Sequence, residues 1–119
     1  MNSEIRTTTR FRKEANRLSR KYSSLKDDLF ILLNTLFQNP TTGIPLGKNF
    51  YKIRLQIASK GKGKSGGARV ITHVTVTFLK DKAQSSIVYL ATIYDKAEMS
   101  TISDKELKLL LQEIQQEIK

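Results

Sequence analysis

Basic side chains at alternating positions are the residues of this sequence with the clearest potential for chemistry. In the segment 50–58, Lys52 and Arg54 alternate with apolar residues, and Arg69 opens the next apolar segment. Alternate residues of a β-strand share one face and lie about 6.7 Å apart. We therefore expect Lys52 and Arg54 to project together, with Arg69 joining them from the neighbouring strand. Such a cluster suits a phosphodiester, because arginine binds two phosphate oxygens and lysine supplies a point charge.

Charge stabilisation is the chemistry that this cluster suits best. One neighbouring cation about 7 Å away interacts with Lys52 by roughly 2.4 kcal/mol at an effective dielectric of about 20. That is too little to favour the neutral amine, so a general-base role for Lys52 would need further cations nearby. We expect the cluster to stabilise a phosphorane-like transition state instead. The alternative is that Lys52 and Arg54 only form the solvated side of a sheet.

A glycine-rich basic loop follows the first of these segments. Residues 60–67, Lys-Gly-Lys-Gly-Lys-Ser-Gly-Gly, suit contacts to a phosphate backbone, because glycine allows close approach. The loop lacks the GxxxxGK[ST] pattern of a nucleotide-binding loop. Tyr94 could stack on a base or pack in the core, and His73 is either a contact or a structural residue. The candidate contacts to nucleic acid are Lys48, Lys60, Lys62, Lys64, His73 and Tyr94.

The distribution of charge favours a polyanionic partner. The chain has 119 residues, with 21 Lys and Arg against 11 Asp and Glu, and a net charge of +10. Residues 29–80 contain eight basic residues and no acidic one, whereas residues 81–119 have a net charge of −2. A concentrated positive region of this kind is typical of nucleic-acid binding. The alternative is a basic protein whose charges are merely solvated.

Composition excludes several classes of site. The sequence has no cysteine and one histidine, which removes disulfides and cysteine catalysis and argues against a metal site built on thiolates or imidazoles. We therefore expect no metal and no small-molecule cofactor. No apolar run approaches the roughly 20 residues that span a bilayer, and the first residues form no signal-peptide core. We expect a cytoplasmic protein with no membrane partner.

The elements that would position the cluster follow from hydrophobic periodicity. They are a strand (4–9), two helices (11–22 and 24–39), a loop (40–47), three strands (50–58, 69–79 and 86–94, the last of them central) and a helix (103–119) that begins with a Ser103–Glu106 capping box. The second helix would bury Leu25, Leu29, Leu32, Leu33, Leu36 and Phe37. This β-α-α-β-β-β-α order predicts one α+β domain over residues 1–119. An N-terminal helical hairpin would pack on an antiparallel sheet that also carries a C-terminal helix.

Three short segments resemble those of a known toxin family. They are 45–47 (Pro-Leu-Gly), 51–55 (Tyr-Lys-Ile-Arg-Leu) and 67–71 (Gly-Ala-Arg-Val-Ile). In this order they resemble the RelE/ParE superfamily of bacterial toxins, most closely its RelE/HigB-like branch, and the resemblance extends over nearly the whole chain. It implies the RelE-like α+β fold and a ribosome-dependent endoribonuclease, or mRNA interferase, that inhibits translation. It also implies two partners, messenger RNA on the ribosome and a cognate antitoxin protein that holds the enzyme inactive.

The resemblance also implies roles for individual residues. Lys52, Arg54 and Arg69 match catalytic basic residues of the family, and Lys96 matches another that follows the last strand. Many members then carry a tyrosine that stacks on the messenger base, whereas residues 99–102 contain none. The implied reaction is metal-independent attack of a ribose 2′-OH on the adjacent phosphate, which yields a 2′,3′-cyclic phosphate and a 5′-OH. The alternatives are a ParE-like toxin that inhibits gyrase and a non-catalytic nucleic-acid-binding protein.

Overall fold

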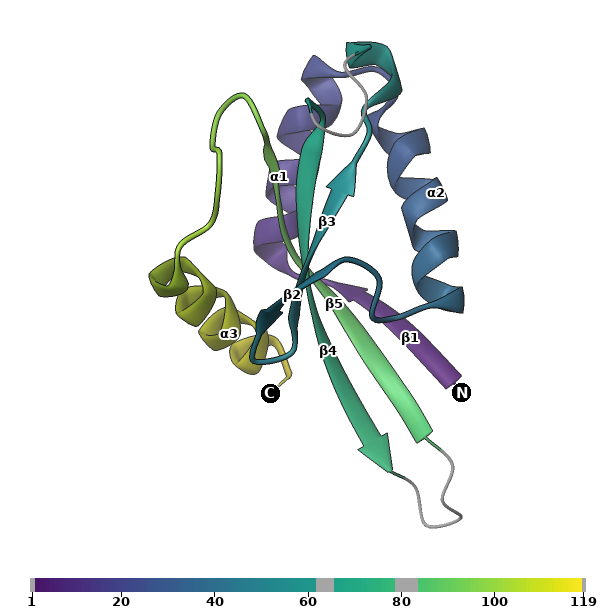
Figure 1. Cartoon of the computed structure of the whole chain (residues 1–119), viewed down its shortest axis with the longest axis vertical. Helices are drawn as coiled ribbons and strands as arrows, with labels where there is room; N and C mark the ends of the chain where they lie inside the picture. The colour runs from purple at the N-terminus through teal and green to yellow at the C-terminus, as the bar shows by residue number, and fades with distance from the viewer. Residues whose placement is uncertain (1, 62–65, 79–83, 119) are drawn as a thin grey trace.

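Helices stand at both ends of a run of strands, which confirms the predicted α+β class. The structure is a computed structural model that describes residues 2–61, 66–78 and 84–118. Its elements (Figure 1) are β1 (Asn2–Thr7), α1 (Thr9–Lys21), α2 (Leu25–Gln38), β2 (Ile44–Gly47), β3 (Phe50–Leu55), the short 3-10 helix η1 (Ala58–Lys60), β4 (Ala68–Phe78), β5 (Gln84–Asp95) and α3 (Asp104–Ile118). Within the described residues, no helix combines the length and apolar character needed to cross a bilayer.

The five strands form one mixed sheet in the order β1-β5-β4-β3-β2. The sequence predicts an antiparallel sheet, and three of the four neighbouring pairs are antiparallel. The prediction is wrong for β1, which pairs in parallel with β5. A parallel pair needs a long connection between its strands, and the segment through α1, α2 and three strands provides one between β1 and β5. β5 lies between β1 and β4 and is buried on both faces, which confirms its predicted central place.

A short strand, β2, forms where the sequence predicts a loop. Ile44 pairs with Lys52 and Pro45 with Tyr51 on the neighbouring β3. Four residues that include a proline and end in a glycine carry little strand signal of their own, and they are typical of a protected sheet edge. Pairing with β3 therefore decides the conformation of this segment, which local periodicity does not reveal.

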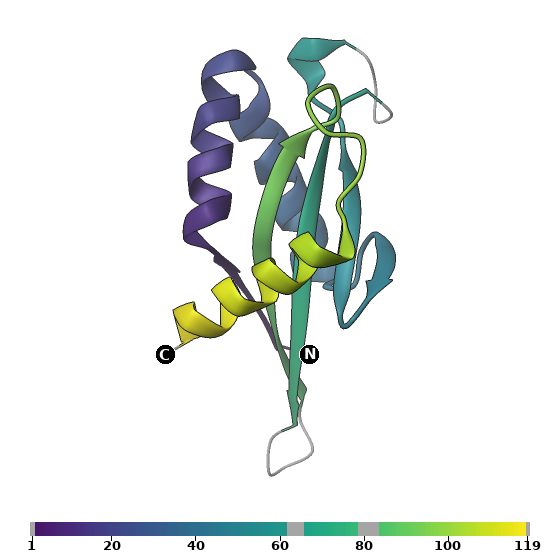
Figure 2. The ribbon, with the colours of Figure 1, turned by 90° about the vertical axis from the view of Figure 1, so that its left-hand side faces the viewer.

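Different helices cover the two faces of the sheet. α1 and α2 pack on one face, where their apolar side chains join those of β3, β4 and β5 in the larger core. On the other face α3 crosses the strands (Figure 2), and Leu107, Leu110 and Ile114 pack on Phe50 and Ile71 in a smaller core. The predicted start of α3 is confirmed, since Ser103 Oγ accepts a hydrogen bond from the Glu106 N–H at 3.2 Å and caps the helix.

Candidate nucleic-acid interface

The strand register brings the predicted basic cluster onto one face of the sheet. Arg54 of β3 lies directly opposite Arg69 of β4, and Arg69 lies opposite Tyr94 of β5. Lys52 lies two residues before Arg54 and therefore on the same face. This is the face that carries α3, because Ile71, the partner of Lys52, belongs to the core under that helix. The expectation that Lys52, Arg54 and Arg69 share a face is confirmed.

The three cations differ in their access to solvent. Arg54 is exposed and Lys52 is half-buried, whereas Arg69 is only 5% exposed. Nη1 of Arg69 donates a hydrogen bond to the carbonyl oxygen of Ala68 at 3.1 Å. An anion on this face would therefore touch Arg54 and Lys52 directly. Arg69 would offer such an anion little direct contact, because so little of it reaches the surface.

No carboxylate of the described residues forms an ion pair with Lys52 or Arg54. The ion pairs of Arg6, Arg10, Arg17, Lys21 and Lys60 involve neither Lys52 nor Arg54. The sequence contributes to this, since β2, β3 and β4 contain no acidic residue, and the fold brings no carboxylate of the other described elements to these two side chains. Lys52 and Arg54 therefore keep their positive charge available at the surface, and we call these two residues, together with Arg69 beside them, the cationic face.

The structure gives Lys60 a different environment from the one that its glycine-rich loop suggests. Its Nζ donates a hydrogen bond at 2.8 Å to Oδ1 of Asp95, a carboxylate with no exposed surface. Tyr22 donates its hydroxyl to Oδ2 of the same carboxylate at 2.6 Å, and the Ala97 N–H donates to Oδ1 at 2.9 Å. Lys60 is thus neutralised and only 10% exposed, so we assign it to anchoring the loop and not to RNA contact.

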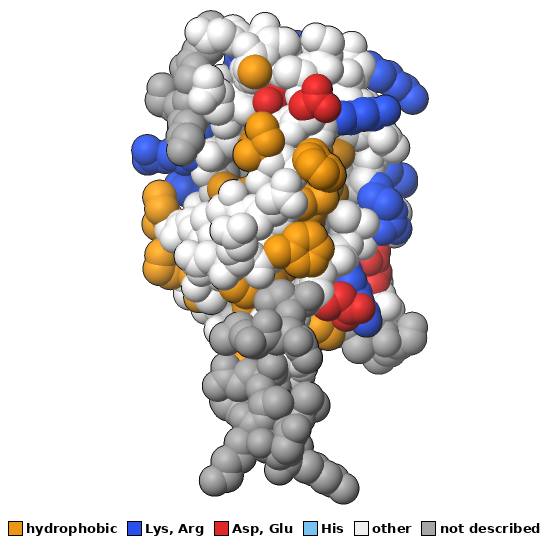
Figure 3. All heavy atoms as spheres, turned by 90° about the vertical axis from the view of Figure 1, so that its right-hand side faces the viewer, with side chains coloured by type: hydrophobic (Ala, Val, Ile, Leu, Met, Phe, Trp, Pro, Cys, Tyr) orange, Lys and Arg blue, Asp and Glu red, His pale blue; other side chains and the backbone are white. Residues whose placement is uncertain are grey.

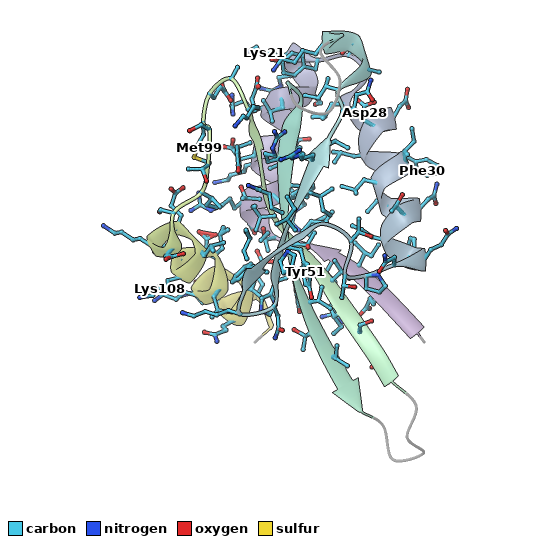
Figure 4. The ribbon with its side chains drawn as sticks, viewed as in Figure 1. Lys21, Asp28, Phe30, Tyr51, Met99 and Lys108 are labelled. Atoms are coloured by element: carbon cyan, nitrogen blue, oxygen red, sulfur yellow. The ribbon has the colours of Figure 1, made fainter. Side chains whose placement is uncertain are left out.

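Opposing effects act on the pKa of Asp95. Burial alone would raise the pKa of this carboxyl, but the hydrogen bonds from Lys60, Tyr22 and the Ala97 N–H hold it well below its usual range. The hydrogen bond to Asp95 in turn raises the pKa of Lys60. Lys21 lies 3.6 Å from the same carboxylate, at the end of α1 nearest η1 (Figure 4). Asp95 therefore ties α1, η1 and β5 together beside the start of β4.

Two further predicted lysines lie at the borders of the sheet. Lys96 follows β5, and its backbone N–H donates to the Gly67 carbonyl at 3.1 Å, next to the start of β4. Its Nζ donates to the Ser100 carbonyl at 3.0 Å, so the side chain turns toward the segment before α3. Lys48 is exposed in the turn between β2 and β3, where it adopts a positive φ of 54°. Lys62 and Lys64 lie outside the described residues.

Both predicted ring residues belong to the core. His73 is 9% exposed and packs edge-on against Phe50 with ring centroids 4.8 Å apart. It lies four residues from Arg69 along β4, about 13 Å away, and burial lowers its pKa, so the ring is neutral near pH 7. Tyr94 is 5% exposed, and burial raises the pKa of its hydroxyl. Neither ring presents an open surface on which a base could stack. The structure therefore favours core packing for Tyr94 and a structural role for His73.

The described ranges contain no group of three or more His, Cys, Asp or Glu side chains that could hold a metal ion. No model of a known protein family matches the chain, and no solved structure matches it. Sequence reasoning missed the Asp95 anchor. No pattern could have revealed it, because Tyr22, Lys60 and Asp95 are separated by more than thirty positions and meet only in the fold.

Proposed function

We propose that this protein is a metal-independent endoribonuclease that cleaves messenger RNA, as the toxin of a toxin–antitoxin pair. The observation that carries the proposal is the cationic face, where Lys52 and Arg54 project beside Arg69 with no described carboxylate paired to Lys52 or Arg54. A face of this kind suits a phosphodiester, because arginine and lysine bind phosphate oxygens strongly. The resemblance of segments 45–47, 51–55 and 67–71 to RelE-like toxins supports the same reaction.

The proposed chemistry uses charge. The phosphate lies against Arg54 and Lys52, and the ribose 2′-oxygen attacks the adjacent phosphorus as its proton leaves to water. The bond from phosphorus to the 5′-oxygen breaks, and that oxygen takes up a proton, which gives a 2′,3′-cyclic phosphate and a 5′-OH. Negative charge grows on the phosphate oxygens during attack, and cations held in place before the reaction stabilise it. Arg69 adds to this field from beneath the surface.

The partners in this proposal are messenger RNA on the ribosome and a cognate antitoxin that is acidic where it binds. The support for an acidic partner is the charge of residues 29–80, which carry eight basic residues and no acidic one. Opposite charges speed encounter and favour the correct partner. A cytoplasmic location is part of the proposal, because messenger RNA and ribosomes are found there.

One observation favours a second candidate function, that of a basic protein that binds nucleic acid without cleaving it. Tyr94 and His73, which could stack on a base, are buried, and Arg69 reaches the surface with only 5% of its area. The cationic face then provides affinity but lacks an aromatic platform. A gyrase-inhibiting toxin of the ParE kind is the outcome to consider if induction stalls DNA cleavage complexes and leaves transcripts whole.

Mapping of transcript ends after brief induction tests the proposal. Wild-type protein is compared with Arg54→Ala, whose side chain is exposed, and with Lys13→Ala, which removes an exposed positive charge from α1 on the far side of the sheet. We expect new 5′-OH ends with wild type and Lys13→Ala, and a loss of about a hundredfold or more with Arg54→Ala. Intact transcripts with all three folded proteins would refute cleavage.

Arg69 requires a paired test because it is buried. Arg69→Ala is compared with Arg69→Lys, and thermal unfolding of both shows whether the fold survives. A catalytic field from Arg69 predicts that Arg69→Lys keeps part of the cleavage and that a folded Arg69→Ala keeps almost none. Equal cleavage by wild type and a folded Arg69→Ala would remove Arg69 from the proposed mechanism.

A further inference from the structure

A groove of about 720 Å³ lies between α2 and β3. Ile31 and Leu32 line it from the helix, and Ile53 and Leu55 line it from the strand. Leu32, Ile53 and Leu55 are themselves part of the larger core, so the walls of the groove are fixed by packing. The groove therefore exists before any partner binds.

The strand side of the groove is an open sheet edge. β2 covers this edge of β3 only as far as Lys52, which pairs with Ile44. The Lys52 carbonyl points to this edge, since a Cβ placed on Gly43, the residue before β2, would lie 2.7 Å from its oxygen. Backbone groups alternate in direction along a strand, so the N–H and C=O of Arg54 point to the same edge. Within the described residues no strand pairs with them there.

Both ends of the groove are closed by the chain. At one end the Ala58 N–H donates a hydrogen bond at 3.2 Å to Oδ2 of Asp28, which joins η1 to α2. Ser24 Oγ reinforces this end by donating to the same oxygen at 2.8 Å. At the other end lie Thr42 and Gly43. The open edge from Lys52 to Gln56 is about 13 Å long, which is room for roughly four residues of an added strand.

Exposed apolar side chains surround the groove. Phe30 and Ile31 of α2 are each 65% exposed, and Ile44 at the far wall is 45% exposed. Phe30 points away from the sheet in Figure 4, and Figure 3 shows apolar side chains gathered along the α2 side of the molecule. Phe37 of α2 is also exposed, so the prediction that it is buried is wrong. Exposed apolar side chains that gather on one side of a protein favour an interaction surface there.

The opposite side of the same edge is positive. Lys52 and Arg54 project from the face that carries α3, whereas Ile53 and Leu55 project toward α2. Side chains of a strand added to this edge would also alternate between the two faces. One set would enter the apolar groove, and the other set would lie beside Lys52 and Arg54, where acidic residues are favoured.

We propose that the edge of β3 binds an extended segment of a partner protein in which apolar and acidic residues alternate. The segment adds a strand next to Arg54, with its apolar side chains against Ile31 and its carboxylates beside Lys52 and Arg54. A second copy of this chain fits less well, because two copies of β3 would bring their own cations together on the edge. This inference goes beyond the proposed function and does not depend on RNA cleavage.

Synthetic peptides test the proposal with the whole protein. The probe is a fluorescein-labelled tetrapeptide of alternating isoleucine and glutamate, blocked at both ends. Three controls share its length: the same residues with the isoleucines grouped together, lysine in place of glutamate, and N-methylation of alternate amides. We expect the alternating peptide to bind at least about tenfold more tightly than each control, because each control removes the apolar pattern, the charge complement or the backbone hydrogen bonds.

Two matched variants locate the site. Ile31→Asp places a charge in the groove, and Leu109→Asp changes an apolar residue of α3 that is 48% exposed and lies outside the groove. We expect Ile31→Asp to weaken peptide binding by about tenfold or more and Leu109→Asp to leave it unchanged. In wild type, the Arg54 amide should exchange more slowly with solvent once the peptide is bound.

Each outcome decides the question. Equal binding of the alternating and grouped peptides, or no protection of the Arg54 amide, would overturn the proposal. So would sedimentation showing a dimer that Ile31→Asp converts to a monomer, because the occupant would then be a second copy. If the wild type cleaves RNA, cleavage retained by Ile31→Asp together with lost peptide binding supports a docking site distinct from the cationic face. If the wild type does not cleave RNA, the peptide measurements alone test the docking site.

Discussion

Two regions of the molecule treat their positive charges in opposite ways. Where α1, η1 and the end of β5 meet, the buried Asp95 holds Lys60, and Glu98 holds Arg17 with contacts of 2.8 and 2.9 Å. On β3, Lys52 and Arg54 have no carboxylate partner within the described residues. A basic side chain thus supports the fold where an acid meets it and is available to a ligand where none does. Net charge alone does not distinguish these two uses.

The largest expected effect comes from breaking the paired region. Asp95→Ala leaves Lys60 buried beside no carboxylate, so we expect the free energy of unfolding to fall by about 3–5 kcal/mol. Urea denaturation measures the free energy of unfolding of each variant. Asp27→Ala is the control, because Asp27 is exposed in the first turn of α2, and it should cost less than about 1 kcal/mol. A similar loss in both variants would mean that the Asp95 pairing contributes little.

The same carboxylate predicts a pH dependence. Because the folded protein holds the pKa of Asp95 below its usual range, its stabilising effect is complete above the unfolded value of about 3.9 and is lost as the pH falls through the folded value. We expect the Tm of wild type to fall more steeply on acidification below about pH 4 than that of Asp95→Asn. Parallel curves for the two proteins would contradict this assignment.

Removing one hydrogen bond from the paired region should have an intermediate effect. Tyr22→Phe deletes the hydroxyl that donates to Asp95 at 2.6 Å and keeps the ring in place. A hydrogen bond to a charged group contributes about 1.5–3 kcal/mol, and we expect a loss near the lower value because Lys60 and the Ala97 N–H still bind the carboxylate. Chemical denaturation measures the change in the free energy of unfolding. A loss as large as that of Asp95→Ala would show that Lys60 and the Ala97 N–H contribute little beside Tyr22.

Adding an acidic residue beside Lys52 and Arg54 should weaken RNA binding by the cationic face. Gln56→Glu places a carboxylate two residues from Arg54, near the open end of β3, at a position that is exposed. Two exposed charges about 7 Å apart in water interact by about 0.6 kcal/mol, so affinity for single-stranded RNA at fixed salt should fall about threefold. Gln112→Glu on α3 adds the same charge elsewhere. Equal losses from both changes would show that only net charge matters.

The smallest expected effect comes from an exposed pair. Glu98→Gln breaks one of the two carboxylate contacts of Arg17, whose side chain is 47% exposed and also binds Glu14. Surface ion pairs of this kind contribute less than about 1 kcal/mol, so stability should change little. Denaturation in low and high salt measures the change. A loss above about 2 kcal/mol would show that this pair stabilises the fold as a buried ion pair does, like that of Asp95 and Lys60.

Periodicity predicted most of the framework and missed what depends on partners distant in sequence. The alternation of Tyr51, Ile53 and Leu55 with Lys52 and Arg54 correctly predicts a strand with a basic face. β2 and the parallel pairing of β1 were missed, because both depend on a neighbouring strand that local pattern cannot identify. The exposure of Phe37 was missed because helical spacing gives a stripe but not the width of the surface that covers it.

The amino-acid order by itself determined the α+β class and the shared face of Lys52 and Arg54, because side-chain direction along a strand follows from a period of two. It also determined that β2, β3 and β4 contain no acid that could neutralise that face. Only the tertiary structure decided which cations stay available, since Asp95 reaches Lys60 across 35 positions while the register buries Arg69 beside Tyr94. Contacts between residues far apart in the chain depend on how the elements pack, and local sequence patterns do not predict that packing.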